Sequence, residues 1–87
     1  MAWTVDVSRS ACQSFPRLPR HVQDWAAKLI ADLHDSPRIP GAEKLSAKGK
    51  RYKVRKGEFR LVYEVRDSDR TVLVPLIGDR KDVYRDL

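Results

Sequence analysis

The sequence predicts an α+β domain in which two helices from the N-terminal half pack on one face of a small, mainly antiparallel four-stranded sheet, in the order β-α-α-β-β-β. One long segment of the first half has a helical apolar period, and four short segments alternate apolar with polar residues. Three of those four segments follow one another in the second half and are separated by turn signals. The 87 residues suit a single domain over 1–87 with a small core. We expect the second face of the sheet to remain open.

The first half of the chain predicts one strand and two helices. The stretch "WTVDV" at 3–7 alternates and indicates a half-buried strand. Ser8 is a suitable N-cap for a short helix that ends at about Phe15. Pro16 and Pro19 then interrupt the chain, because each lacks a backbone donor. The long amphipathic helix should span Arg20 to His34, with an apolar stripe made of Val22, Trp25, Ala26, Leu29, Ile30 and Leu33.

The second half predicts a loop and three strands. "RIPGAEKLSAKGK" has little periodicity and indicates a loop, and strands should follow at about 51–55, 59–66 and 71–77. Lys56-Gly57 is expected as a two-residue turn, and "DSDR" at 67–70 as the second turn. Pro75 cannot donate to a ladder, so it must sit at an edge, at a bulge or where its missing N–H is not needed.

The register of the first hairpin follows from its predicted turn. With Lys56-Gly57 at the tip, position 54 faces 59, and Lys53 directly faces Arg60. Tyr52, Val54, Phe59, Leu61, Tyr63 and Val65 then share the face that receives the long helix. The opposite face carries Lys53, Arg55, Glu58, Arg60, Val62 and Glu64.

The positive charge of the chain is concentrated in this hairpin and the loop before it. The net charge is zero over 1–43, +7 over 44–60 and −1 over 61–87, against +6 for the whole chain. A basic face partly offset by Glu58 and Glu64 would explain such a surface without any ligand. The alternative is a polyanion partner, with Lys and Arg holding phosphate groups. Opposed cations favour this second interpretation, because like charges across a ladder are destabilising.

Several functional classes find no support in the sequence. No apolar run approaches the roughly 20 residues of a membrane span, and no secretory leader is visible, so we expect a cytoplasmic protein. Cys12 is the single cysteine, and we interpret it as a packing residue. His21 and His34 flank the long helix, and no acidic or histidine cluster has metal-ligand spacing. A nuclease built from this chain would therefore work with Lys, Arg and Tyr, without metal or cofactor.

The stretches "YKVRKGEFRLVYEV" and "IGDRKDVYR" resemble the RelE/ParE superfamily of toxins from toxin–antitoxin pairs. The resemblance covers nearly the whole chain, including "FPRLPRHVQDW" and "DSPRIPGAEKL". RelE-like members cleave messenger RNA in the ribosomal A site, whereas ParE-like members poison DNA gyrase and generally lack the basic catalytic residues. The resemblance thus implies a ribosome-dependent endoribonuclease toxin that uses the RNA 2′-OH, with a gyrase inhibitor or a catalytically decayed RNA-binding module as alternatives.

The resemblance also assigns roles to single residues. It implies Lys53 as the candidate general base and Arg55 as the second basic position, where well-known members have Lys. Arg60 would clamp the phosphate, Arg80 would bind it and assist the leaving group, and Tyr84 would stack on the substrate nucleotide.

Further basic residues would contact RNA or the ribosome without base specificity. They are Lys44, Lys48, Lys50, Arg51, Lys56, Lys81 and Arg85. The partners that the resemblance implies are messenger RNA near the 16S rRNA of the A site and a cognate antitoxin. An acidic or amphipathic antitoxin segment could fold as it covers the basic surface.

Overall fold

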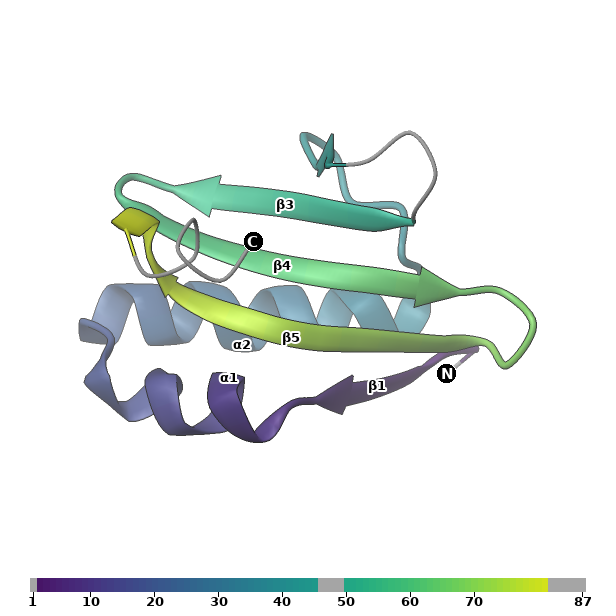
Figure 1. The fold of residues 1–87 in the computed structure, drawn as a ribbon, viewed down its shortest axis with the longest axis horizontal. Coiled ribbons are helices and arrows are strands. Elements are labelled where there is room, and N and C mark those ends of the chain that lie inside the picture. Colours follow the sequence, from purple (N-terminus) through teal and green to yellow (C-terminus); the bar gives the residue numbers. More distant parts are fainter. Residues whose placement is uncertain (1, 46–49, 82–87) are drawn as a thin grey trace.

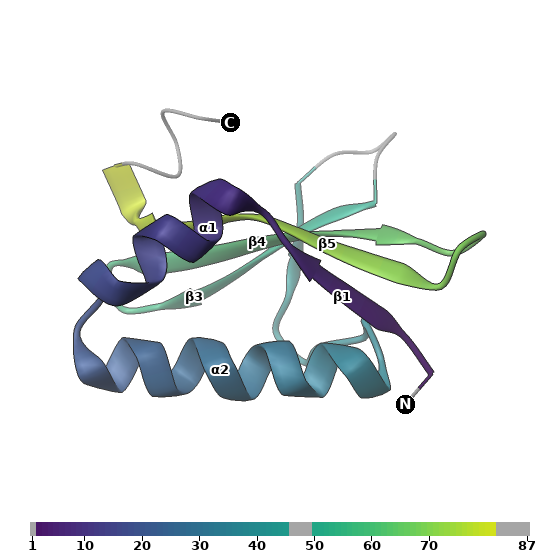
Figure 2. The same ribbon diagram turned by 90° about the horizontal axis from the view of Figure 1, so that it is seen from below.

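The computed structural model describes residues 2–45 and 50–81, which form a five-stranded mixed sheet with the long helix across one face and the short helix beside the edge of the sheet (Figures 1 and 2). The elements are β1 Thr4–Val7, α1 Arg9–Ser14, a 3₁₀ turn Phe15–Arg17, α2 Arg20–Asp35, β2 Glu43–Lys44, β3 Arg51–Lys56, β4 Phe59–Arg66 and β5 Thr71–Asp79. The strand order is β1-β5-β4-β3-β2. The predicted α+β class is confirmed, with five described strands rather than four. None of the helices in the described ranges is long and apolar enough to cross a membrane.

Ser8 caps α1 as the sequence indicated and also ties the helix to the sheet. Its hydroxyl oxygen accepts a hydrogen bond from the N–H of Ala11 at 3.0 Å. The same hydroxyl donates to the carbonyl of Pro75 at 2.8 Å, and the Ser8 N–H donates to the carbonyl of Val74 at 3.0 Å. Because two of these bonds reach β5, α1 lies beside β5, beyond the end of β1 (Figure 1).

The core lies between α2 and one face of the sheet, as Figure 2 shows. The apolar stripe of α2 buries Val22, Ala26, Leu29 and Leu33 at the predicted helical spacing. These side chains join one cluster with Leu61, Tyr63 and Val65 of β4 and with Val72, Val74 and Ile77 of β5. The helix bounds differ from the predicted ones by a single residue, which is the usual uncertainty at a helix end.

Strand β5 lies between β1 and β4, and it pairs with β1 in parallel and with β4 in antiparallel orientation. The β4–β5 ladder changes register between the pairs Val62–Leu76 and Glu64–Leu73, so β5 holds one extra residue there. Pro75 falls within this bulge, where its missing N–H interrupts no regular ladder bond. The predicted placement of Pro75 at an irregular position is therefore confirmed.

The first hairpin has a different register from the predicted one. Its turn is Gly57-Glu58, and Arg55, not Lys53, lies directly opposite Arg60, whereas Lys53 lies opposite Val62. Gly57 has φ +59°, and a two-residue turn with Gly at its first central position needs positive φ there. Each residue of β3 therefore pairs with a residue two positions further along β4 than predicted. Because side chains alternate with period two, the predicted division of the hairpin into two faces still holds.

Strand β2 was not predicted, since the sequence indicated a loop throughout this region. Glu43 pairs with Lys53 and Lys44 with Tyr52, antiparallel to β3. A strand of two residues is too short to show an alternating pattern, and it forms here because β3 offers a free edge. This short strand brings Glu43 to the edge of the cationic hairpin.

Candidate functional site

The outer face of the hairpin, meaning the side of β3 and β4 turned away from α2, gathers four of the predicted site residues. It consists of Arg51, Lys53 and Arg55 on β3 and of Arg60, Val62 and Glu64 on β4. The alternating apolar residues of both strands hold this face in place through the core on the other side. The hairpin therefore presents four cations from a rigid sheet.

Arg60 is the most unusual residue of the outer face, because only 6% of it is exposed. Its Nη1 donates to the carbonyl of Gly57 at 2.7 Å and to that of Phe59 at 3.0 Å. These bonds aim the guanidinium at the turn. The buried Nε finds no hydrogen-bond partner among the residues that the structure describes. Leaving a buried donor unsatisfied costs about 1–3 kcal/mol, so Arg60 is poised to gain from an acceptor such as a phosphate oxygen.

Arg55 and Arg60 form a directly opposed cross-strand pair. Arg55 is exposed, whereas Arg60 is buried. Two cations directly opposed across a ladder repel each other, and a bound anion between them would relieve the repulsion. An opposed basic pair is therefore present, but it consists of Arg55 and Arg60, whereas the sequence predicted Lys53 and Arg60.

Lys53 lies between the arginines of β3, and its side chain is only 11% exposed. Its Nζ is 3.6 Å from Oε2 of Glu43, its partner across the β2–β3 ladder. Sequence reasoning missed Glu43, because only the pairing of β2 reveals that it faces Lys53. The ion pair leaves Lys53 within the cationic face and places a solvated carboxylate at its edge.

A second ionic cluster lies at the other end of the outer face. Glu64 is 3.7 Å from Nε of Arg51 and 3.5 Å from Nε of Arg66. Arg51 therefore belongs to the same face as Lys53, but it is already held by a carboxylate.

Arg80 follows β5 directly, and its N–H donates to the carbonyl of Glu58 at 2.7 Å. This bond brings the main chain of Arg80 to the tip of the hairpin, next to the start of β4, where Phe59 pairs with Asp79. The predicted proximity of Arg80 to the hairpin is confirmed at the level of the backbone.

The other predicted contact residues are distributed over several surfaces. Lys44 pairs with Tyr52 and Lys56 with Phe59, so both belong to the helix-facing register. Lys50 forms an ion pair with Asp67, and Lys81 is exposed. Lys48, Tyr84 and Arg85 lie outside the described residues. Their expected contacts with RNA, like those of the outer face, stay predictions.

Within residues 2–45 and 50–81, no group of three or more His, Cys, Asp or Glu side chains is arranged to hold a metal ion.

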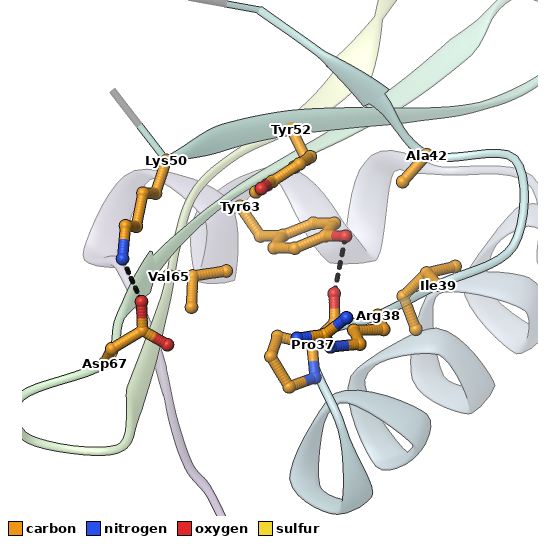
Figure 3. Close-up of a pocket in the computed structure, with 9 residues that line it drawn as sticks. All are labelled: Pro37, Arg38, Ile39, Ala42, Lys50, Tyr52, Tyr63, Val65 and Asp67. Carbon is orange, nitrogen blue, oxygen red and sulfur yellow. Dashed lines mark hydrogen bonds and ion pairs between the residues drawn. The ribbon is translucent and has the colours of Figure 1, made fainter. Parts of the chain in front are cut away.

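A cavity of about 370 Å³ opens on the opposite side of the sheet, between the segment after α2 and the start of β3 (Figure 3). The rings of Tyr52 and Tyr63 stack at one wall, with centroids 5.3 Å apart. The Tyr63 hydroxyl donates to the carbonyl of Pro37 at 2.9 Å, and the ion pair of Lys50 with Asp67 borders the cavity. This cavity is separate from the outer face. The hydrogen bond from the Tyr63 hydroxyl attaches the loop after α2 to the sheet.

Replacing Tyr63 with Phe should destabilise the fold in a pH-dependent way. Burial, with a smaller effect of the Tyr52 phenol, raises the pKa of Tyr63 to about 12. Since the unfolded value is about 10, the hydroxyl's contribution is fully present below pH 10 and is lost as the pH rises through 12. We expect a loss of about 0.5–1.5 kcal/mol in urea unfolding at pH 8. An equal difference between wild type and Y63F at pH 8 and pH 11.5 would contradict this assignment.

No family model matches the sequence, but individual known proteins are similar to it. A putative RelE-like toxin of Escherichia coli is 32% identical over 97% of this chain and 92% of its own length. The mRNA interferase toxin RelE of Escherichia coli K12 is 33% identical, with the same coverage of both chains.

Solved structures agree with these relatives. An arginine double mutant of the E. coli toxin RelE in the free state superposes with a TM-score of 0.78 at 29% identity, covering 98% of this chain and 93% of that one. The toxin of the intact E. coli RelBE toxin–antitoxin complex gives a TM-score of 0.75 at 28% identity, covering 90% and 96%. The archaeal RelE–RelB complex of Pyrococcus horikoshii shares the fold, with a TM-score of 0.79 at 21% identity over 92% of this chain and 97% of that one. A relative at 32% identity over almost the full length of both chains shows that this chain belongs to the RelE family of toxins.

Proposed function

We propose that this chain is the toxin of a toxin–antitoxin pair and acts as a ribosome-dependent endoribonuclease that cleaves messenger RNA in the A site without a metal ion. The observation that carries the proposal is the buried Arg60, whose Nε has no acceptor among residues 2–45 and 50–81, within a face that also holds Lys53 and Arg55. A relative that covers nearly the whole chain is named an mRNA interferase, which supports the same reading.

The chemistry begins with the RNA 2′-OH as the nucleophile. Lys53, as a neutral amine, would take the proton from this hydroxyl while the oxygen attacks the adjacent phosphorus. The bond from phosphorus to the 5′-oxygen then breaks, and this oxygen takes a proton from water, which leaves a 2′,3′-cyclic phosphate and a 5′-hydroxyl. The residues of the hairpin would therefore accept one proton and stabilise a crowded anion.

The arginines would supply the charge stabilisation. Arg60 is held by two carbonyls of the turn, so its guanidinium needs little reorganisation when the phosphorane develops negative charge. Arg55 opposes it from β3, and Arg80 begins beside the hairpin tip, where it could assist the departing oxygen. Because Nε of Arg60 is buried, a phosphate oxygen can reach it only after neighbouring groups shift.

The ribosome would contribute the orientation of the message. The outer face is one face of a sheet, and an extended RNA strand laid along such a face keeps many conformations. Holding the 2′-OH in line with the scissile bond accounts for a large part of the rate in such reactions. We therefore infer that RNA fixed in the A site is cleaved and that free RNA is a poor substrate.

An antitoxin would keep the toxin inactive by covering the cationic hairpin. Structural neighbours of this chain include toxin–antitoxin complexes named RelBE and RelE–RelB. The concentration of charge at 44–60 favours a partner segment that is acidic or amphipathic and that folds as it binds.

Primer extension on a defined message tests this function. The message is presented free and on a ribosome stalled with an empty A site, and wild type is compared with Lys53→Ala and Arg80→Ala. We expect a wild-type cut in the A-site codon only with the ribosome, and its loss in both variants. A folded protein that cuts in neither condition would refute the proposal, and a supercoiling assay would then test gyrase inhibition. Equal cutting of free RNA at physiological salt would refute the ribosome requirement alone.

A further inference from the structure

The short strand β2 places a carboxylate beside the candidate base. Glu43 and Lys53 are directly paired across the β2–β3 ladder, so both side chains point to the outer face. The distance from Nζ to Oε2 is 3.6 Å. The side chain of Glu43 is 68% exposed, against 11% for Lys53. The carboxylate thus remains hydrated while the amine has lost most of its water.

We propose that Glu43 is a positioning residue that acts through Lys53: in the RNA-free toxin it occupies the place beside the amine that an RNA phosphate takes on binding. The role of Glu43 in cleavage rests on the proposed function, but the ion pair between Glu43 and Lys53 does not.

The geometry favours a displaceable counter-ion over a fixed one. A separation of 3.6 Å is longer than a normal hydrogen bond, so the contact is mainly an attraction between charges. Glu43 belongs to a strand of two residues, and its exposure allows the carboxylate to turn into water at little cost. A phosphate can then take its place, because it carries the same sign of charge and more acceptor oxygens.

The charges around Lys53 explain why a counter-ion is needed. Three further cations share its face of the hairpin, and Glu64 is already shared by two arginines, at 3.7 and 3.5 Å. The charged groups that face Lys53 from the described elements are Glu43 on β2, Arg51 and Arg55 on β3, and Arg60 and Glu64 on β4. Glu43 therefore offsets repulsion that would otherwise push Lys53 off the face.

The first test measures the Lys53 amine without any RNA. Competitive labelling with acetic anhydride at pH 7.5, read by mass spectrometry, reports how fast this amine reacts as the neutral form. We expect Lys53 of Glu43→Gln to be labelled about two- to fivefold faster than in wild type, the range that an exposed ion pair supplies. Glu58→Gln is the matched control, because it removes the same charge from an exposed residue of the same hairpin. Equal labelling in all three proteins would overturn the proposal.

The second test measures RNA. The affinity for a fully 2′-O-methylated RNA, which cannot be cleaved, should rise about two- to fivefold in Glu43→Gln beyond any rise in Glu58→Gln. On the ribosome, the second-order rate constant for cleavage at limiting toxin should rise about two- to fivefold in Glu43→Gln beyond any rise in Glu58→Gln. The single-turnover rate at saturating toxin should stay at the wild-type value, because Glu43 has already left Lys53 once RNA is bound. A merely structural role for Glu43 would instead lower the affinity and both rates, and this outcome would also overturn the proposal.

The two tests separate the inference from the proposed function. Faster labelling of Lys53 with no cleavage by any variant would keep Glu43 as the counter-ion and refute the nuclease. Normal cleavage by wild type with no change in labelling or affinity in Glu43→Gln would keep the nuclease and refute the role of Glu43.

Discussion

Replacing Lys53 with alanine should lower the ribosome-dependent cleavage rate about 10²- to 10⁴-fold, the usual contribution of a positioned general base. The fold should survive, because Glu43, which loses its ion pair with Lys53, is 68% exposed and stays hydrated. Single-turnover cleavage of a message on stalled ribosomes measures the rate, and circular dichroism with urea unfolding checks the fold.

The variant Lys53→Arg sharpens this prediction. Arginine keeps the positive charge but does not deprotonate in proteins. We expect it to retain RNA affinity within about twofold while its cleavage rate falls as far as that of the alanine variant. Lys28→Ala on α2, where Lys28 is exposed and paired with Asp32 at 3.5 Å, removes the same charge far from the hairpin and serves as the control. Full activity in Lys53→Arg would contradict the role of Lys53 as a base.

Replacing Arg60 with alanine should have a double effect. The cleavage rate should fall about 10²- to 10³-fold, as when one preorganised donor to a developing anion is removed. The fold should also lose stability, because Nη1 no longer bonds the carbonyls of Gly57 and Phe59 at the turn. Urea unfolding measures the loss of stability. The cleavage rate is then compared only under conditions in which each variant is folded, so unfolding does not contribute to its fall.

Arg60→Lys and a distant arginine complete this test. A lysine keeps a charge at the position but lacks the planar guanidinium whose Nη1 bonds both carbonyls of the turn, so we expect partial stability and a cleavage rate close to that of Arg60→Ala. Arg20→Ala removes an exposed arginine that pairs with Asp24 at 3.3 Å, and it should change neither property appreciably. A folded Arg60→Ala protein with wild-type cleavage would show that this guanidinium does not hold the phosphate.

Much of the fold could be predicted because each long element carries its own pattern. The cap at Ser8, the apolar stripe of α2 and the alternation of β4 are local signals, and the structure confirms the elements that they indicate. Strand β2 carries no such signal, since two residues cannot show a period and their pairing depends on the edge of β3. The predicted strand count therefore fell one short of the five described strands.

The candidate site was predictable as a face but not as a set of contacts. Alternation with period two assigned Lys53, Arg55 and Arg60 to one side of the hairpin, and this assignment survives the corrected register. Which residues oppose each other depends on the turn, and the sequence did not reveal whether Gly57 occupies its first or second central position. The burial of Arg60 and its bonds to the turn follow from that geometry, whereas the pairing of Glu43 with Lys53 depends on the short strand β2.

A message with a single 2′-deoxynucleotide on the 5′ side of the scissile phosphate tests the central claim most directly. It is placed in the A site of a stalled ribosome beside the all-ribose message, and the ends of the products are identified. We expect the all-ribose message to yield a 2′,3′-cyclic phosphate and a 5′-hydroxyl, and the deoxy-substituted linkage to stay intact. Cleavage at the deoxy linkage, or products that carry a 5′-phosphate, would contradict an attack by the 2′-OH on the cationic face of this hairpin.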